Sequence, residues 1–272
     1  MKRSASSIGD RTYEEDGFVN CYVQSHYQDS IRSYLRKNPR AKKNDSTRFF
    51  QISLKNYYEE IIRFFFDGEV RPELALDLGC SVGRSTMTIA KYAKKVYGVD
   101  PSFAQIRVAR RIAEQKKIAV TIGQSRFPYP KKGVLLEIPV EGKSENVEFV
   151  VGDDTTLSLI PFMFDAVCSL AVIDRVRDLR PFLRNVQKCM HPGSLLLLST
   201  PFDWDRAYTP PKNWLGTGAY GLKKGKPEDA LKELLYGFGF TFVREKNFLW
   251  PTLIDSRSHV IWSVYAGVFR LQ

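Results

Sequence analysis

The sequence predicts an α/β fold, with one mostly parallel sheet covered by helices on both faces. Strand-type runs alternate with helix-type patterns between residues 74 and 200, and the strand runs are mostly apolar. Continuously apolar strands are typical of a sheet that is buried on both faces. A chain of 272 residues, 43% of them hydrophobic, is large enough for such a core. We therefore expect one α/β domain over residues 71–272, preceded by an N-terminal helical extension, or lid, over residues 1–70.

The strands and helices of this domain follow one another in a regular order. Asp100, Pro101 and Ser102 form a helix start signal directly after the second strand run. Such alternation is typical of strand–helix–strand units. The expected strands are residues 73–79, 96–100, 147–154, 164–173 and 194–200, and the expected helices between them are residues 85–95, 102–115 and 178–190.

Two segments depart from this alternation. Residues 118–146 contain Gly and Pro punctuation and the run GVLLEIPV, which favours an inserted β-hairpin. After a long loop at residues 201–226 come a helix, PEDALKELLYGFG, and two strands near FTFVREKN and SHVIWSVYAGVFR. This order predicts a seven-stranded sheet in which the last strand runs antiparallel.

The extension is polar and charged up to residue 45 and amphipathic after it. Residues 46–66 carry aromatic and aliphatic side chains at mostly helical spacing, which predicts a helix packed on the main domain. No apolar stretch approaches the roughly 20 residues that span a bilayer, and the N-terminal residues lack an apolar signal core. We expect a soluble, cytoplasmic protein with no membrane partner.

Charge and cysteine content exclude some classes of protein. The net charge of +11 is spread over short basic clusters, so solvated surface is favoured over nucleic-acid binding, which stays open. The four cysteines form no CxxC pair and only three histidines are present. Neither a metal site nor a disulfide framework is indicated, and buried free thiols are expected.

The glycine-containing break after the first strand is the main functional signal. It reads DLGCSVG and matches neither GxGxxG nor the P-loop pattern, and Ser81 stands where a close-approach glycine would lie. An anion beside Asp77 would be poorly accommodated, whereas a cationic ligand would be favoured. S-adenosylmethionine carries an ammonium and a sulfonium on an adenosine, and it therefore suits this turn better than a pyrophosphate does.

Acidic residues also end the next two strands. Asp100 ends the second strand, where a carboxylate can accept hydrogen bonds from both ribose hydroxyls. Asp153 and Asp154 end the third, where a carboxylate can accept from the adenine amino group. Each of them alone can equally be a helix cap. Their joint order and spacing favour the cofactor-binding interpretation.

With these motifs, residues 74–200 resemble the class I S-adenosylmethionine-dependent methyltransferases, which implies a Rossmann-like fold. Residues 13–29, 164–183 and 195–216 further resemble the 4-mercaptohistidine N1-methyltransferases of ovothiol biosynthesis. That resemblance implies N-methylation of an imidazole. The chain departs from the family pattern with Ala171 in place of an Asn and Asp174 in place of a Cys, whereas Arg175 is kept.

The site residues follow from the motifs and from these resemblances. No catalytic residue is assigned, because methyl transfer from a sulfonium requires alignment and not a covalent nucleophile. For Tyr27 and Trp214, packing in the core is the stronger alternative, and for His26 the structural and binding roles are balanced. Arg175 is expected to pair with an acceptor carboxylate. The predicted cofactor-binding residues are Tyr13, Asp77, Gly79, Cys80, Gly83, Asp100, Pro101, Asp153, Asp154 and Leu170, and the predicted acceptor-binding residues are His26, Tyr27, Asp174, Arg175, Asp203, Trp204 and Trp214.

Other functions remain open from the sequence. An RNA or protein methyltransferase gains support from the net charge and from the insert KKGVLLEIPVEGK, but SLAVID after the fourth strand contains no NPPY-like tetrapeptide. A methyltransferase for another small molecule and a binding module without turnover are the further alternatives.

Overall fold

The computed structural model describes residues 16–38, 56–69, 71–122, 134–140, 144–253 and 259–272. Tyr13 and residues 46–55 of the predicted N-terminal helix lie outside these ranges. None of the helices in the described ranges combines the length and the apolar character needed to cross a membrane.

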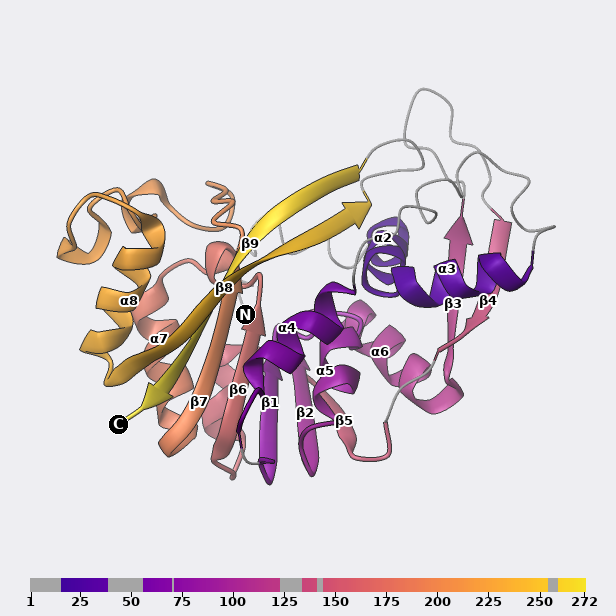
Figure 1. Ribbon diagram of the computed structural model, residues 1–272, viewed down its shortest axis with the longest axis horizontal. Coiled ribbons are helices and arrows are strands. Elements are labelled where there is room, and N and C mark those ends of the chain that lie inside the picture. Colours follow the sequence, from indigo (N-terminus) through magenta and orange to yellow (C-terminus); the bar gives the residue numbers. More distant parts are fainter. Residues whose placement is uncertain (1–15, 39–55, 70, 123–133, 141–143, 254–258) are drawn as a thin grey trace, which may run out of the picture.

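A seven-stranded sheet forms the centre of the molecule (Figure 1). Its strands lie in the order β5-β2-β1-β6-β7-β9-β8, and all neighbours are parallel except β9, which runs antiparallel to both β7 and β8. The predicted seven strands and the antiparallel last strand are therefore confirmed. The strands are β1 (Leu74–Leu78), β2 (Lys95–Asp100), β5 (Val147–Val151), β6 (Phe164–Leu170), β7 (Met190–Thr200), β8 (Phe240–Leu253) and β9 (His259–Leu271).

The strand order reverses between β1 and β6. From β1 the chain moves outward to β2 and β5, and it then returns to the other side of β1 as β6. Because these strands are parallel, their carboxyl ends meet at one edge of the sheet. Ligands of open α/β sheets bind at such a reversal, outside the carboxyl ends.

Helices pack on both faces of the sheet, as predicted. On one face α7 (Leu179–Lys188) and α8 (Pro227–Gly237) bury Leu183 and Leu231 in the larger core. On the other face α4 (Tyr57–Phe65) and the end of α5 (Arg84–Ile89) bury Ile61 and Ile89 against β1 and β7. Helix α6 (Phe103–Gln115) packs beside β2 and β5.

Helix α5 is shorter than predicted. The amides of Lys94 and Lys95 donate to the carbonyls of Pro72 and Glu73, at the start of β1. The chain must leave the helix early to make these bonds, so residues 91–94 form a turn that leads into β2. Local helix propensity is overridden here by strand pairing.

The inserted hairpin is confirmed as an antiparallel pair, β3 (Lys117–Ile122) with β4 (Val134–Pro139). Helices α2 (Asp16–His26) and α3 (Gln28–Lys37) pack on this pair, with Val23 and Ile31 buried in a shared core (Figure 1). Asn20 also exchanges two hydrogen bonds with the backbone of Thr121. The hairpin therefore supports the N-terminal helices.

Candidate cofactor and acceptor site

The turn after β1 requires glycine at two positions. Gly79 and Gly83 have φ angles of +82° and +81°. A Cβ on Gly79 would lie 2.3 Å from Val172 Cγ2, and one on Gly83 would lie 2.6 Å from the Phe149 ring. Packing against Val172 and Phe149 therefore excludes side chains from both positions, and of the two glycines Gly79 lines the main cavity.

Asp100 is fixed by the same turn. Its Oδ2 accepts from the Ser81 amide and its Oδ1 from the Ser102 amide, each at 2.9 Å. The residue is 7% exposed and lines the main cavity of this edge. The carboxylate at the end of β2 is therefore held in one orientation beside the glycine turn.

Asp77 lies under the turn and does not line the cavity. Ser85 Oγ and Thr86 Oγ1 both donate to its Oδ2 at 2.6 Å, and its Oδ1 has no hydrogen-bond partner among the described residues. Burial raises the pKa of Asp77 to about 6, although the two hydroxyl groups oppose this rise. A cation bound above the turn would favour the charged form.

The acidic pair after β5 has two roles. Asp153 accepts from the amides of Thr155 and Thr156 and caps the short helix η3 (Asp154–Leu159). Asp154 accepts from Asn185 Nδ2 at 2.9 Å, and burial raises its pKa. Both aspartates line the cavity, so the capping role of Asp153 does not remove it from the cavity wall.

A single cavity of about 770 Å³ joins these strand ends to the N-terminal helices. At one end it is lined by the glycine turn and the strand-end acids, and at the other by aromatic side chains of α2, α4 and β8. Of the predicted residues the structure brings together Gly79, Asp100, Pro101, Asp153, Asp154, Leu170, His26 and Arg175 in its walls.

Several polar atoms in these walls have no partner. Ser81 Oγ, Gln105 Oε1, His26 Nδ1 and Trp250 Nε1 are buried without a hydrogen bond in the described part of the chain, and all four belong to lining residues. Native proteins leave few buried polar atoms unsatisfied. The set contains both donors and acceptors, as a polar adenosyl cofactor and an acceptor molecule require.

Residues 50–245 match the family model described as a methyltransferase domain. The chain belongs to this family. Its methyl donor is S-adenosylmethionine, and the unpaired polar groups beside the glycine turn and Asp100 fit that molecule.

Relatives of this methyltransferase are distant. Norajmaline N-methyltransferase of Rauvolfia serpentina is 25% identical over 152 residues, 54% of this chain and 44% of the relative. A ubiquinone biosynthesis O-methyltransferase of Methylobacterium is 26% identical over 125 residues, 46% of this chain and 39% of the relative. The matches thus span less than half of either relative's length.

A solved structure from work on the conversion of a disulfide bond into a thioacetal group in echinomycin biosynthesis has a similar fold. Its TM-score is 0.51 at 17% identity, and the match covers 78% of this chain and 81% of that one. At this identity the likeness supports the fold alone.

At the acceptor end of the methyltransferase, His26 lies among aromatic rings. Its ring centroid is 4.8 Å from that of Tyr58, 5.5 Å from Tyr22 and 6.5 Å from Trp250. Burial, and secondly the charge of Arg84, lower the pKa of His26 to about 3. The imidazole is therefore neutral at physiological pH.

Arg175 lines the cavity, but its charge is already partnered. It forms ion pairs with Asp174 at 3.3 Å and Asp203 at 2.9 Å, and it also donates to the Asp203 carbonyl. Asp174 is 1% exposed, and burial raises its pKa. Asp174 and Asp203 thus hold Arg175 and do not themselves line the cavity.

Other predicted residues lie outside the cavity walls. Tyr27 is fully buried, donates to the Val82 carbonyl and packs under Arg84. Trp214 donates to the Thr209 carbonyl, and Trp204 packs beside Phe202. The packing alternative therefore describes Tyr27, whereas Trp214 is partly buried.

Cys80 and Gly83 belong to the turn but also do not line the cavity. Cys80, Cys168 and Cys189 are buried free thiols, as expected, whereas Cys21 is only partly buried.

The sequence did not indicate six aromatic wall residues: Tyr22, Tyr57, Tyr58, Phe182, Tyr208 and Trp250. Periodicity assigned Tyr57 and Tyr58 to the packed face of a helix, and both are indeed 4% exposed. Both tyrosines nevertheless also line the cavity, which helical periodicity alone does not distinguish from packing in the core.

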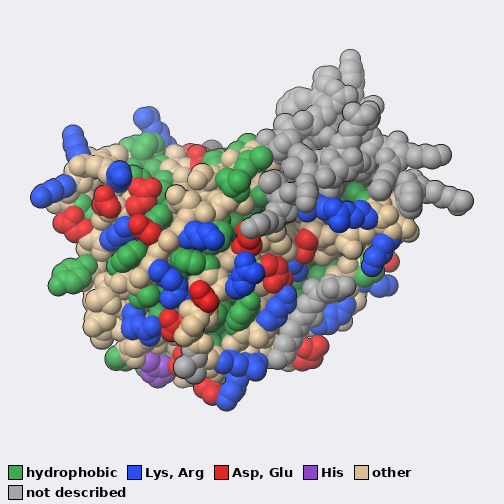
Figure 2. All heavy atoms as spheres, in the orientation of Figure 1, with side chains coloured by type: hydrophobic (Ala, Val, Ile, Leu, Met, Phe, Trp, Pro, Cys, Tyr) green, Lys and Arg blue, Asp and Glu red, His purple; other side chains and the backbone are tan. Residues whose placement is uncertain are grey.

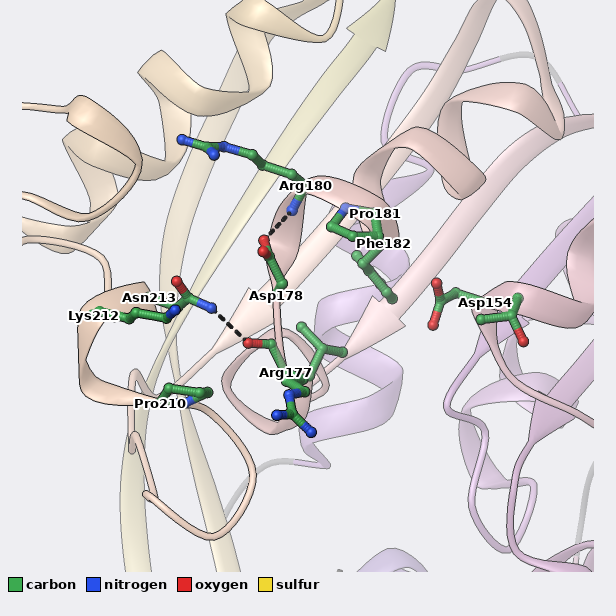
Figure 3. A pocket seen from close by; sticks show the side chains of 11 residues that line it. Asp154, Arg177, Asp178, Arg180, Pro181, Phe182, Pro210, Lys212 and Asn213 are labelled. Atoms are coloured by element: carbon green, nitrogen blue, oxygen red, sulfur yellow. Dashed lines mark hydrogen bonds between the residues drawn. The ribbon is translucent and has the colours of Figure 1, made fainter. Parts of the chain in front are cut away.

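A second pocket adjoins the first and shares Asp154, Val176, Arg177 and Phe182 with it (Figure 3). Two hydrogen bonds join residues of its wall. Asp178 accepts from the Arg180 amide, and Asn213 donates to the Arg177 carbonyl (Figure 3). The main cavity, with its unpaired buried atoms, is therefore the better candidate for the reaction site.

Proposed function

We propose that this protein transfers a methyl group from S-adenosylmethionine to a small molecule, and that the acceptor is the imidazole of 4-mercaptohistidine or of a related histidine derivative. The observation that carries the proposal is the single cavity that runs from the glycine turn to an aromatic end. A flat ring fits aromatic walls, and the sequence resemblance to ovothiol enzymes points to an imidazole. Ala171 and Asp174, which depart from that family, leave related acceptors within the proposal.

The strand-end residues would hold the cofactor. Asp100, oriented by the Ser81 and Ser102 amides, would accept from the ribose hydroxyls, and Asp154 would accept from the adenine amino group. The negative charge of Asp77, which lies beneath the turn, would stabilise the cationic part of S-adenosylmethionine. When bound, S-adenosylmethionine supplies a methyl group already activated by the sulfonium.

The chain's own contribution is alignment and exclusion of water. Holding the acceptor in line can supply roughly 7–11 kcal/mol in favourable cases. A neutral imidazole attacks through its lone pair and loses its proton afterwards. His26 does not store this proton, because its pKa of about 3 keeps it neutral.

Two further observations favour a small acceptor over a polymer. The curated relatives are named for norajmaline and for ubiquinone biosynthesis, both small molecules. On the face shown in Figure 2, Lys and Arg side chains are interspersed with Asp and Glu and form no continuous basic stripe. We also propose that the protein is located in the cytoplasm.

The test is incubation with labelled S-adenosylmethionine and a panel of 4-mercaptohistidine, histidine, small phenols and RNA, with products identified by mass. We expect label in an N-methylated imidazole. Label in RNA or protein only, or in a phenol only, would contradict the proposed acceptor.

Cofactor binding should weaken at acid pH because of Asp77. In the folded protein the pKa of Asp77 is about 6, above the usual value of 3.8, so between pH 3.8 and pH 6 the Asp77 side chain is mostly protonated. Binding of a cation above the turn favours the ionised carboxylate, and the proton is then released. If the cofactor requires the ionised form, affinity falls roughly tenfold from pH 7 to pH 5. Calorimetry in buffers of different ionisation enthalpy would detect the released proton.

Asp77→Asn is the matched control, because the amide oxygen still accepts from Ser85 and Thr86. This variant should bind with weaker affinity and without the pH dependence between pH 5 and 7. An identical pH profile in both proteins would show that another group titrates.

A further inference from the structure

The acceptor end of the cavity is an aromatic box of five rings, Tyr22, His26, Tyr57, Tyr58 and Trp250. The rings come from α2, α4 and β8, three elements that are distant in sequence. Tyr57 stacks on Trp250 with centroids 5.3 Å apart and an interplanar angle of 22°. The walls are therefore flat surfaces at the end of a cavity that begins at the cofactor residues.

Contacts outside the box hold its walls in place. Gln28 Nε2 donates to the carbonyl of Pro251, next to Trp250, and so ties α3 to β8. Asn56 caps α4 through the Tyr58 and Glu59 amides. Tyr57 shares a buried hydrogen bond with Ser199 at the end of β7. A preformed box of this kind loses little conformational entropy when a ligand enters.

Two buried polar atoms of the box have no hydrogen-bond partner among the described residues. Trp250 Nε1 can only donate a hydrogen bond, whereas a neutral histidine has one donor and one acceptor nitrogen. His26 Nδ1 and Trp250 Nε1 are both buried without a partner among the described residues. An apolar ligand would leave both unsatisfied, which costs affinity.

Arg84 and the bound donor both disfavour a cationic ligand in the box, although Arg84 is itself paired with Asp29 and Glu59. Aromatic cages commonly bind cations. Here the Arg84 guanidinium acts on His26 strongly enough to lower its pKa further after burial. The sulfonium of the bound donor would add a second positive charge at the other side. A neutral ring avoids both repulsions.

We propose that the aromatic box binds a neutral heteroaromatic ring, and that Trp250 and His26 select it through hydrogen bonds to its polar atoms. This inference rests on the proposed function and deepens it by naming the residues that recognise the acceptor. Trp250 and His26 are then specificity residues of the methyltransferase. Tyr57 and Tyr58 supply contact area.

The experiment uses the full chain saturated with S-adenosylhomocysteine, so that no turnover occurs, and titrates 4-mercaptohistidine, histidine and tetramethylammonium at pH 8 by calorimetry. Trp250→Phe and His26→Phe keep a ring in each wall and remove only the polar atoms. We expect each variant to bind the imidazole probes at least about fivefold more weakly, the loss typical of one hydrogen bond. Affinity for S-adenosylhomocysteine should not change.

Trp262→Phe is the matched control. Trp262 is paired with Trp250 in the β8–β9 ladder, but its Nε1 donates to Thr252 Oγ1 and it does not line the cavity. This variant should bind the imidazole probes like the parent protein.

Three results would overturn the inference. A cavity of about 20 Å³ behind the box is also bordered by His26 and Trp250, and it has room for one water molecule. If the polar atoms of His26 and Trp250 bind that water molecule and not the ligand, both variants would bind the imidazole probes with unchanged affinity. This is the first of the three results. Tighter binding of tetramethylammonium, or no binding of any imidazole probe, would also overturn it. Failure of the parent protein to bind S-adenosylhomocysteine would instead overturn the proposed function.

Discussion

Asp100→Ala is expected to lower affinity for S-adenosylhomocysteine by about a hundredfold or more. The carboxylate would make two charge-assisted hydrogen bonds to the ribose, each worth roughly 1.5–3 kcal/mol. The substitution also leaves the amides of Ser81 and Ser102 without their acceptor, which loosens the glycine turn. Calorimetry with the purified full chain measures the change.

Asp165→Ala is the control for this experiment. Asp165 also accepts from two backbone amides, those of Glu73 and Leu74, but it does so at the amino end of β1, the opposite edge of the sheet. It should lower stability without changing cofactor affinity. Equal losses of affinity in the two variants would remove Asp100 from the cofactor site.

Arg84→Met is expected to lower the free energy of unfolding by about 3 kcal/mol. The Arg84 side chain is 5% exposed and pairs with Asp29 at 2.7 Å and Glu59 at 3.4 Å, so it joins α3 and α4 to the first turn after Gly83. Breaking a buried pair typically costs 3–5 kcal/mol, and the partly exposed carboxylates place this case at the lower end. Denaturant unfolding monitored by tryptophan fluorescence measures the loss.

Lys91→Met tests whether the burial of Arg84 causes the large loss of stability expected for Arg84→Met. Lys91 also pairs with Glu59, at 2.6 Å, but its side chain is 43% exposed. Exposed pairs contribute about 0–1 kcal/mol, so this variant should be nearly as stable as the parent. A loss equal to that of Arg84→Met would show that the buried ion pair has no special role.

The sheet could be predicted because its information is local. The run at β6 is apolar on both faces, and the strand ends are marked by DLG, VD and GDD, so strands, order of elements and acidic ends all follow from short windows. The inserted hairpin was equally visible from its alternation. The length of α5 could not be predicted, because it is set by the hydrogen bonds of Lys94 and Lys95 to the carbonyls of Pro72 and Glu73. These two residues lie outside the stretch of sequence around the helix.

For the same reason, the cavity walls around the glycine turn could be predicted better than the aromatic walls. Gly79 and Asp100 act within two residues of a strand end, where position in the fold is fixed by the sheet. The aromatic box assembles Tyr22, Tyr58 and Trp250 from three elements, and their meeting depends on how α2 packs on the inserted hairpin and how β8 extends past the sheet. Tyr27, which follows His26 in the sequence, was predicted to bind the acceptor. Its side chain instead lies in the core, where its hydroxyl donates to the Val82 carbonyl.

The central claim is that carboxylates at neighbouring strand ends hold an adenosyl cofactor in the main cavity. A crystal structure of the full chain with S-adenosylhomocysteine tests it most directly. We expect the ribose hydroxyls to lie on Asp100, the adenine beside Asp154 and the sulfur facing the aromatic box. A ligand bound outside this cavity, or an Asp100 side chain that makes no contact with the ribose, would contradict it.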